Sequence, residues 1–64
     1  MRLTEFWERM QGQFGASYAD SLARDQVLSE LGGRTVTEAL EDGEPARRVW
    51  RAVCEAFDVP ARNR

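Results

Sequence analysis

The 64-residue sequence contains no histidine, no lysine and only one cysteine, Cys54. Histidine is the commonest general base and metal ligand in proteins, and a lone cysteine forms neither a zinc finger nor an intrachain disulfide. These absences exclude Cys–His catalysis and a small secreted domain held together by disulfides. We therefore expect a cytoplasmic protein that is not an enzyme, with no catalytic residues, no metal site and no cofactor.

Long apolar runs are missing as well. The first ten residues, MRLTEFWERM, interrupt their apolar positions with Glu5, Glu8 and Arg9. A signal peptide or a membrane-spanning segment needs an uninterrupted apolar stretch, so we expect neither export nor membrane insertion. The composition of 42% apolar and 31% charged residues is that of an ordinary folded domain, and the length allows only one.

Apolar residues recur at spacings of three and four, which is the pattern of amphipathic helices. The clearest case begins at Pro45, carries Trp50 and Phe57 on one face, and ends before Pro60. Thr35 and Glu38 have the spacing of a capping box and indicate the start of a shorter helix. A buried position is expected for Cys54, which lies on the apolar face of the last helix.

The stretch 17–31 is the least regular part of the pattern. Ser17 and Asp20 could cap a helix, and Gly32 and Gly33 could end it. Its apolar residues spread around much of the helix, which indicates either a central helix contacted on several sides or a break near Asp25. We favour the continuous central helix.

No segment shows the alternation of a strand, so the sequence predicts an all-α single domain, a compact bundle of three to four short helices. The predicted helices cover residues 4–14, 17–31, 36–41 and 45–57, and residues 61–64 are predicted to form a frayed tail.

Positive charge is concentrated in the last third of the chain. Residues 43–64 carry five arginines against three acidic residues, a net charge of +2, whereas residues 1–42 carry four against eight, a net charge of −4. Arg47, Arg48 and Arg51 lie within about 100° of one another around a helix, enough to hold a phosphate backbone or an acidic protein patch. They could equally be the solvated face of a core helix.

Six aromatic residues in so short a chain are more than a small core easily covers. Tryptophan and arginine are enriched where proteins bind one another, which makes Trp7, Trp50 and the three arginines a candidate interaction face. The sequence therefore predicts a non-enzymatic interaction or regulatory module that binds a protein partner, or a second copy of itself as a homodimer.

Nucleic-acid binding is the alternative hypothesis. Residues 25–31, the Gly32-Gly33 turn and residues 35–40 could form a helix-turn-helix. The second helix of that arrangement would carry Glu38 and Glu41, which would meet phosphates with like charge. Protein binding is therefore the favoured interpretation.

Three strings, MRLTEFWERM, ARDQVLSELGGRTVTEAL and VWRAVCEAFDVPARNR, together cover most of the chain. In them the sequence resembles a family of short actinobacterial proteins known only as a domain of unknown function. The resemblance carries no catalytic motif and so assigns no site residues. It implies a cytoplasmic, single-domain helical protein. The family's gene neighbourhood, which holds a recombinase and its regulator, implies a role near DNA repair.

Overall fold

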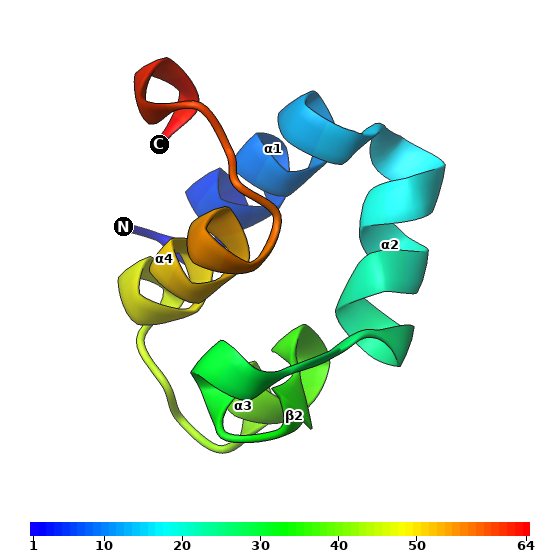
Figure 1. The fold of residues 1–64 in the computed structure, drawn as a ribbon, viewed down its shortest axis with the longest axis vertical. Coiled ribbons are helices and arrows are strands. Elements are labelled where there is room, and N and C mark those ends of the chain that lie inside the picture. The colour runs from blue at the N-terminus through cyan, green and yellow to red at the C-terminus, as the bar shows by residue number, and fades with distance from the viewer.

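A computed structural model describes all 64 residues and contains four α-helices (Figure 1). The helices are α1 (Leu3–Phe14), α2 (Ala16–Asp25), α3 (Val36–Glu41) and α4 (Ala46–Ala56). The remaining elements are two short strands and two 3-10 turns: β1 (Val27–Leu28), η1 (Ser29–Leu31), β2 (Arg34–Thr35) and η2 (Ala61–Asn63). The prediction of a compact, mostly helical fold is confirmed, but the prediction of a purely all-α fold is wrong because β1 and β2 form a small antiparallel sheet.

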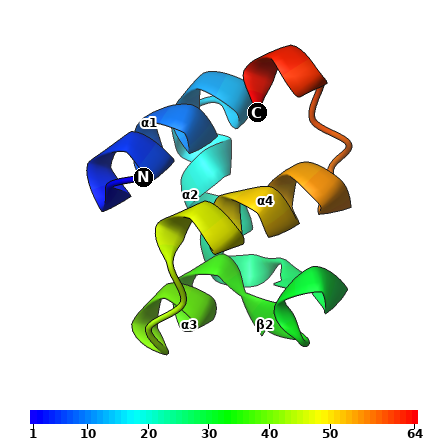
Figure 2. The ribbon, with the colours of Figure 1, turned by 90° about the vertical axis from the view of Figure 1, so that its left-hand side faces the viewer.

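Helix α4 lies in the middle of the molecule, with α1 on one side and α3 on the other (Figure 2). Helix α2 contacts both α1 and α3 and so closes the side opposite the chain ends (Figure 1). One cluster of 15 buried residues joins these elements. Its large members come from all four α-helices, from β1 and η1, and from the segment after α4: Phe6, Met10, Leu22, Leu28, Leu31, Val36, Val49, Trp50, Val53 and Val59.

Three of the predicted helices agree with the structure to within one residue at each end. Their start signals are local, as the capping box of α3 illustrates. The Thr35 hydroxyl oxygen accepts from the Glu38 backbone N–H at 3.1 Å, and the Glu38 carboxylate accepts from the Thr35 backbone N–H at 2.9 Å. Pro45 precedes the first residue of α4, where its missing N–H is not needed.

The predicted continuous helix over 17–31 is wrong. Helix α2 ends at Asp25, Gln26 is extended, and Val27 and Leu28 pair with Thr35 and Arg34 in a hairpin. The turn of this hairpin uses Gly32 and Gly33, whose φ angles of +68° and +82° suit glycine. The hairpin buries Leu28 and Leu31 and leaves Val27 exposed, whereas a continuous helix would place Val27 and Leu31 one turn apart on the same face.

The last four residues fold back against the rest of the protein through the turn η2 and do not extend away from it as the predicted frayed tail would. Asp58, with φ of +53°, reverses the chain after α4, and the buried Val59 side chain anchors the return. The Arg64 guanidinium then donates to the Val59 carbonyl oxygen at 2.7 Å, and Asn63 donates to Gln13 of α1 at 3.2 Å. Because the Asn63–Gln13 hydrogen bond joins residues 50 positions apart, no local pattern could predict it.

Arg34 connects the hairpin to the segment between α3 and α4. Its guanidinium donates to the Leu31 carbonyl oxygen at 2.8 Å, to the Asp42 carboxylate at 3.1 Å and to the Glu44 carboxylate at 2.6 Å. Arg48 of α4 also reaches Glu44, at 3.0 Å. The hydrogen bond from Arg34 is the main reason that the pKa of the Glu44 carboxyl lies below its ordinary value.

Replacing Glu44 with glutamine should therefore destabilise the protein at neutral pH but not in strong acid. The pKa of Glu44 is lower in the folded than in the unfolded protein, so its contribution to stability is full above the ordinary carboxyl range. That contribution disappears as the pH falls through the folded-state pKa. Urea unfolding of wild type and E44Q should give free energies of unfolding that differ at neutral pH and converge in strong acid. A difference that stays constant with pH would contradict this prediction.

None of the helices combines the length and the apolar character that crossing a membrane requires.

Candidate functional site

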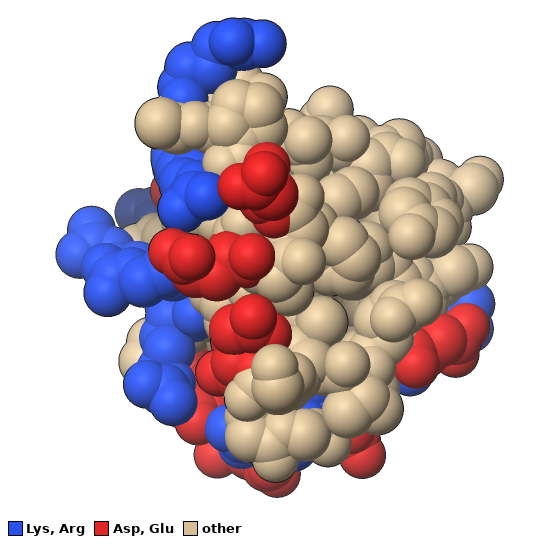
Figure 3. Space-filling model, in the orientation of Figure 1, with Lys and Arg blue, Asp and Glu red and all other residues tan.

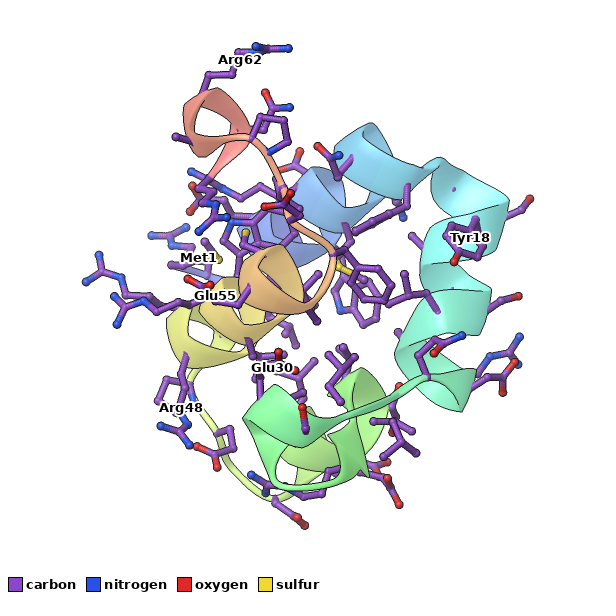
Figure 4. All side chains as sticks on the ribbon, viewed as in Figure 1. Met1, Tyr18, Glu30, Arg48, Glu55 and Arg62 are labelled. Atoms are coloured by element: carbon purple, nitrogen blue, oxygen red, sulfur yellow. The ribbon has the colours of Figure 1, made fainter.

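A hollow of about 470 Å³ opens between α1, α4 and the end of the chain. We call it the arginine hollow because four guanidinium groups line it. Its lining consists of Arg9, Arg47, Arg51 and Arg64, the carboxylates of Glu5 and Glu55, and a floor of Met1, Trp50 and Cys54. Met1 and Glu55 mark its position on the side of α4 that faces away from Tyr18 of α2 (Figure 4).

Two of the four arginines in the hollow are neutralised within the protein. Arg9 pairs with Glu5 at 3.2 Å, and Arg64 pairs with Glu55 at 3.3 Å. Arg47 and Arg51, one helical turn apart on α4, form no ion pair. Arginine side chains line the left edge of the molecule in Figure 3, with acidic side chains directly beside them and a broad uncharged face beyond. The hollow therefore presents two unneutralised positive charges.

Contrary to the prediction, Arg48 does not lie in the arginine hollow with Arg47 and Arg51. Its side chain extends away from the arginine hollow (Figure 4) and pairs with Glu44. Glu44 in turn binds Arg34, so Arg48 belongs to the group that supports the hairpin. The residue that follows Arg47 in a helix is turned by about 100°, which is enough to place it beside a different partner.

Trp50 is not available as an exposed anchor, contrary to the predicted interaction face. Its side chain is 3% exposed because α1 covers the apolar face of α4, and its ring meets Phe6 edge to face with centroids 6.2 Å apart. Trp7 is half-buried, and its ring packs edge to face on Phe6 with the ring centroids 5.2 Å apart. Of the two tryptophans, only Trp7 keeps an exposed part, and Trp50 contributes mainly to the core.

A pair of donors at the edge of the hollow converges on one oxygen atom. Arg9 Nη1 donates to the main-chain oxygen of Arg64 at 2.6 Å, and Trp50 Nε1 donates to the same atom at 3.2 Å. Neither Arg9 nor Arg64 was predicted as a site residue. They come from opposite ends of the sequence, and neither belongs to a recognisable local motif.

Cys54 is buried in the floor of the hollow, as expected. Burial raises the pKa of its thiol above the ordinary value, while the nearby Arg64 opposes that shift. The thiol is therefore protonated near neutral pH, and Cys54 adds an uncharged surface to the floor. Reactive cysteines have the opposite character, with a lowered pKa and an exposed sulfur.

Residues 1–62 match a protein family described as "Protein of unknown function (DUF3046)". The chain belongs to this family. A protein from Mycobacterium tuberculosis (strain ATCC 25618 / H37Rv), named "Putative envelope-preserving system protein", is 50% identical to it over 36 residues. The matched region makes up 56% of this chain and 13% of that protein's length. No solved structure matches the chain. The predicted resemblance to an uncharacterised actinobacterial family is confirmed.

The helix-turn-helix suggested by the sequence of this family member is not formed. Residues 25–31 contain β1 and η1 instead of a first helix, and α3 has six residues. Glu38 and Glu41 of α3 are exposed, so the surface of this helix is acidic. No cluster of three or more cysteine, aspartate or glutamate side chains that could hold a metal ion is present.

Proposed function

We propose that this protein is a small, non-enzymatic interaction module that binds an acidic segment of a partner protein in the arginine hollow. The observation that carries the proposal is the pair Arg47 and Arg51, which lack an acidic partner of their own and lie beside an apolar floor. A guanidinium group stays charged at any physiological pH and binds carboxylates through two parallel N–H groups. Two such groups one helical turn apart suit a pair of carboxylates.

The surroundings of the arginine pair favour a peptide over a nucleic acid. Glu5 and Glu55 lie within the same hollow, so negative charge is favoured at Arg47 and Arg51 but not along the whole hollow. A phosphate backbone carries a charge at every nucleotide and cannot avoid these two carboxylates, whereas a flexible peptide can turn side chains that do not fit toward solvent. A peptide can place its carboxylates at Arg47 and Arg51 and an apolar side chain against Met1 of the floor. Nucleic-acid binding through the same arginines is the alternative, and the experiment below distinguishes the two.

We also propose that the interaction takes place in the cytoplasm, which the free thiol of Cys54 supports because such thiols persist in reducing compartments. The relative from Mycobacterium tuberculosis carries the name of an envelope-preserving system. A partner should therefore be sought among proteins at the inner side of the cell envelope as well as among fully cytoplasmic ones.

Charge reversal of the arginine pair should abolish binding of an acidic peptide. The probe, called the acidic probe below, is a fluorescein-labelled hexapeptide of five glutamates and one leucine that is blocked at both ends. Fluorescence anisotropy should show that R47E/R51E binds it at least about tenfold more weakly than wild type, because two charge-assisted contacts become repulsive. The matched control is R24E/R62E, which has the same net charge but alters residues outside the hollow; it should stay within about twofold of wild type.

Three outcomes would contradict the proposal. Equal weakening in both double variants would mean that only the total charge matters. Undiminished binding in R47E/R51E would place the peptide elsewhere. Tighter binding of a short DNA duplex than of the acidic probe, with a steep dependence on salt, would favour the nucleic-acid alternative.

A further inference from the structure

We infer that Arg64, at the end of the segment 61–64, occupies part of the arginine hollow as an internal substitute for the partner, and that a partner carboxylate replaces the main-chain oxygen of Arg64 when it binds. This inference rests on the proposed function and adds to it the exact atoms that receive the partner. Residues 61–64 then compete with the partner for the hollow, and this competition sets the affinity of the module.

The first argument is the chemistry of the two donors. Trp50 is 3% exposed, and its indole N–H reaches the Arg64 main-chain oxygen at 3.2 Å. Indole can only donate, so a buried Trp50 needs an acceptor at this position whether or not the tail is in place. Arg9 Nη1 points at the same oxygen from 2.6 Å. A carboxylate oxygen has free lone pairs and can accept from both groups.

The second argument is how weakly the segment is held. All four residues 61–64 are exposed and none belongs to the core. Apart from the donor pair and the hydrogen bond from Arg64 to Val59, the contacts that hold it are the exposed Asn63–Gln13 hydrogen bond at 3.2 Å and the exposed Arg64–Glu55 ion pair at 3.3 Å. Exposed contacts of this kind contribute little to stability, and segments held by them open readily.

The third argument is the anchor that precedes the segment. Val59 is buried, and its carbonyl oxygen accepts from Arg64 Nε at 2.7 Å. Displacement of residues 61–64 can therefore leave the core intact, because the chain remains fixed at Val59. The turn η2 lies beside the C-terminal end of α1 in Figure 2. The segment therefore has only to move off the surface of α1 to open the hollow.

The variant R64A separates competition from simple attraction, because the two effects have opposite signs. The substitution removes a positive charge from the hollow, which by attraction alone would weaken binding of the acidic probe. It also removes the guanidinium contacts to Val59 and Glu55 that hold the segment closed. Competition therefore predicts binding that is tighter by about threefold or more. R62A removes the same charge from an exposed side chain of the same segment and should stay within about twofold of wild type.

Tighter binding by R64A, with R62A unchanged, would support the inference. Weaker binding by R64A would show that the segment is part of the binding surface and would overturn the inference, while the proposed function would survive if R47E/R51E still lost the probe. If R47E/R51E bound as well as wild type, the proposed function would fail and the inference with it. Failure of wild type and R64A alike to bind the probe would overturn both.

Discussion

Leu31→Ala should lower the free energy of unfolding by about 2–5 kcal/mol, the range for truncation of a large buried side chain. Leu31 is 0% exposed and inserts from η1 into the core, where η1 packs against α4. A chain of this length has a total stability of only about 3–10 kcal/mol, so the variant should be close to unfolded. Urea unfolding followed by circular dichroism measures the difference.

Val27→Ala is the matched control for that substitution. Val27 is 61% exposed, so its truncation should change the free energy of unfolding by less than about 0.5 kcal/mol. In a continuous helix, residues 27 and 31 would lie one turn apart on the same face and would be buried alike. Similar losses in the two variants would therefore favour the helix over the hairpin.

Trp50→Ala should also have a large effect, lowering the free energy of unfolding by about 3–5 kcal/mol. Its ring packs against Phe6 in the core, and its indole N–H binds the Arg64 main-chain oxygen. Thermal unfolding should show the loss directly, and the conservative variant W50F should remain folded because it keeps a ring in the core.

Trp7→Ala serves as the comparison. Because Trp7 is only half-buried, its truncation should lower the free energy of unfolding by less than that of Trp50 does. If Trp50 were mainly an interface anchor, W50A would keep wild-type stability and lose only binding. That result would contradict the position of Trp50 in the core.

Sequence alone could predict α1, α3 and α4 because the signals that start and end them lie within a few residues of each helix. The capping box of Thr35 and Glu38 and the proline before α4 are examples. The hairpin could not be predicted in the same way. Its strands have two residues each, too short for a recognisable alternation, and Gly32-Gly33 is as typical of a helix end as of a hairpin turn.

The candidate site was only partly predictable, for a related reason. Arg47 and Arg51 stand out as a charged pair at helical spacing on α4, and the structure leaves them without ion pairs. Arg48 has the same local pattern, yet its role depends on Glu44 and Arg34 from the neighbouring segment. Arg9 reaches Arg64 across 55 residues of sequence, a contact that only the packing of α1 against α4 brings about.

The most direct test of the central claim is a titration of ¹⁵N-labelled protein with the acidic probe, followed by two-dimensional NMR. We predict that the backbone signals of residues 47–51 and the indole signal of Trp50 move, because both border the arginine hollow. The signals of Tyr18 and its neighbours on α2, on the opposite side of the molecule, should stay in place (Figure 4). Shifts centred on Tyr18, or on the acidic surface of α3, would contradict the assignment of the arginine hollow as the binding site.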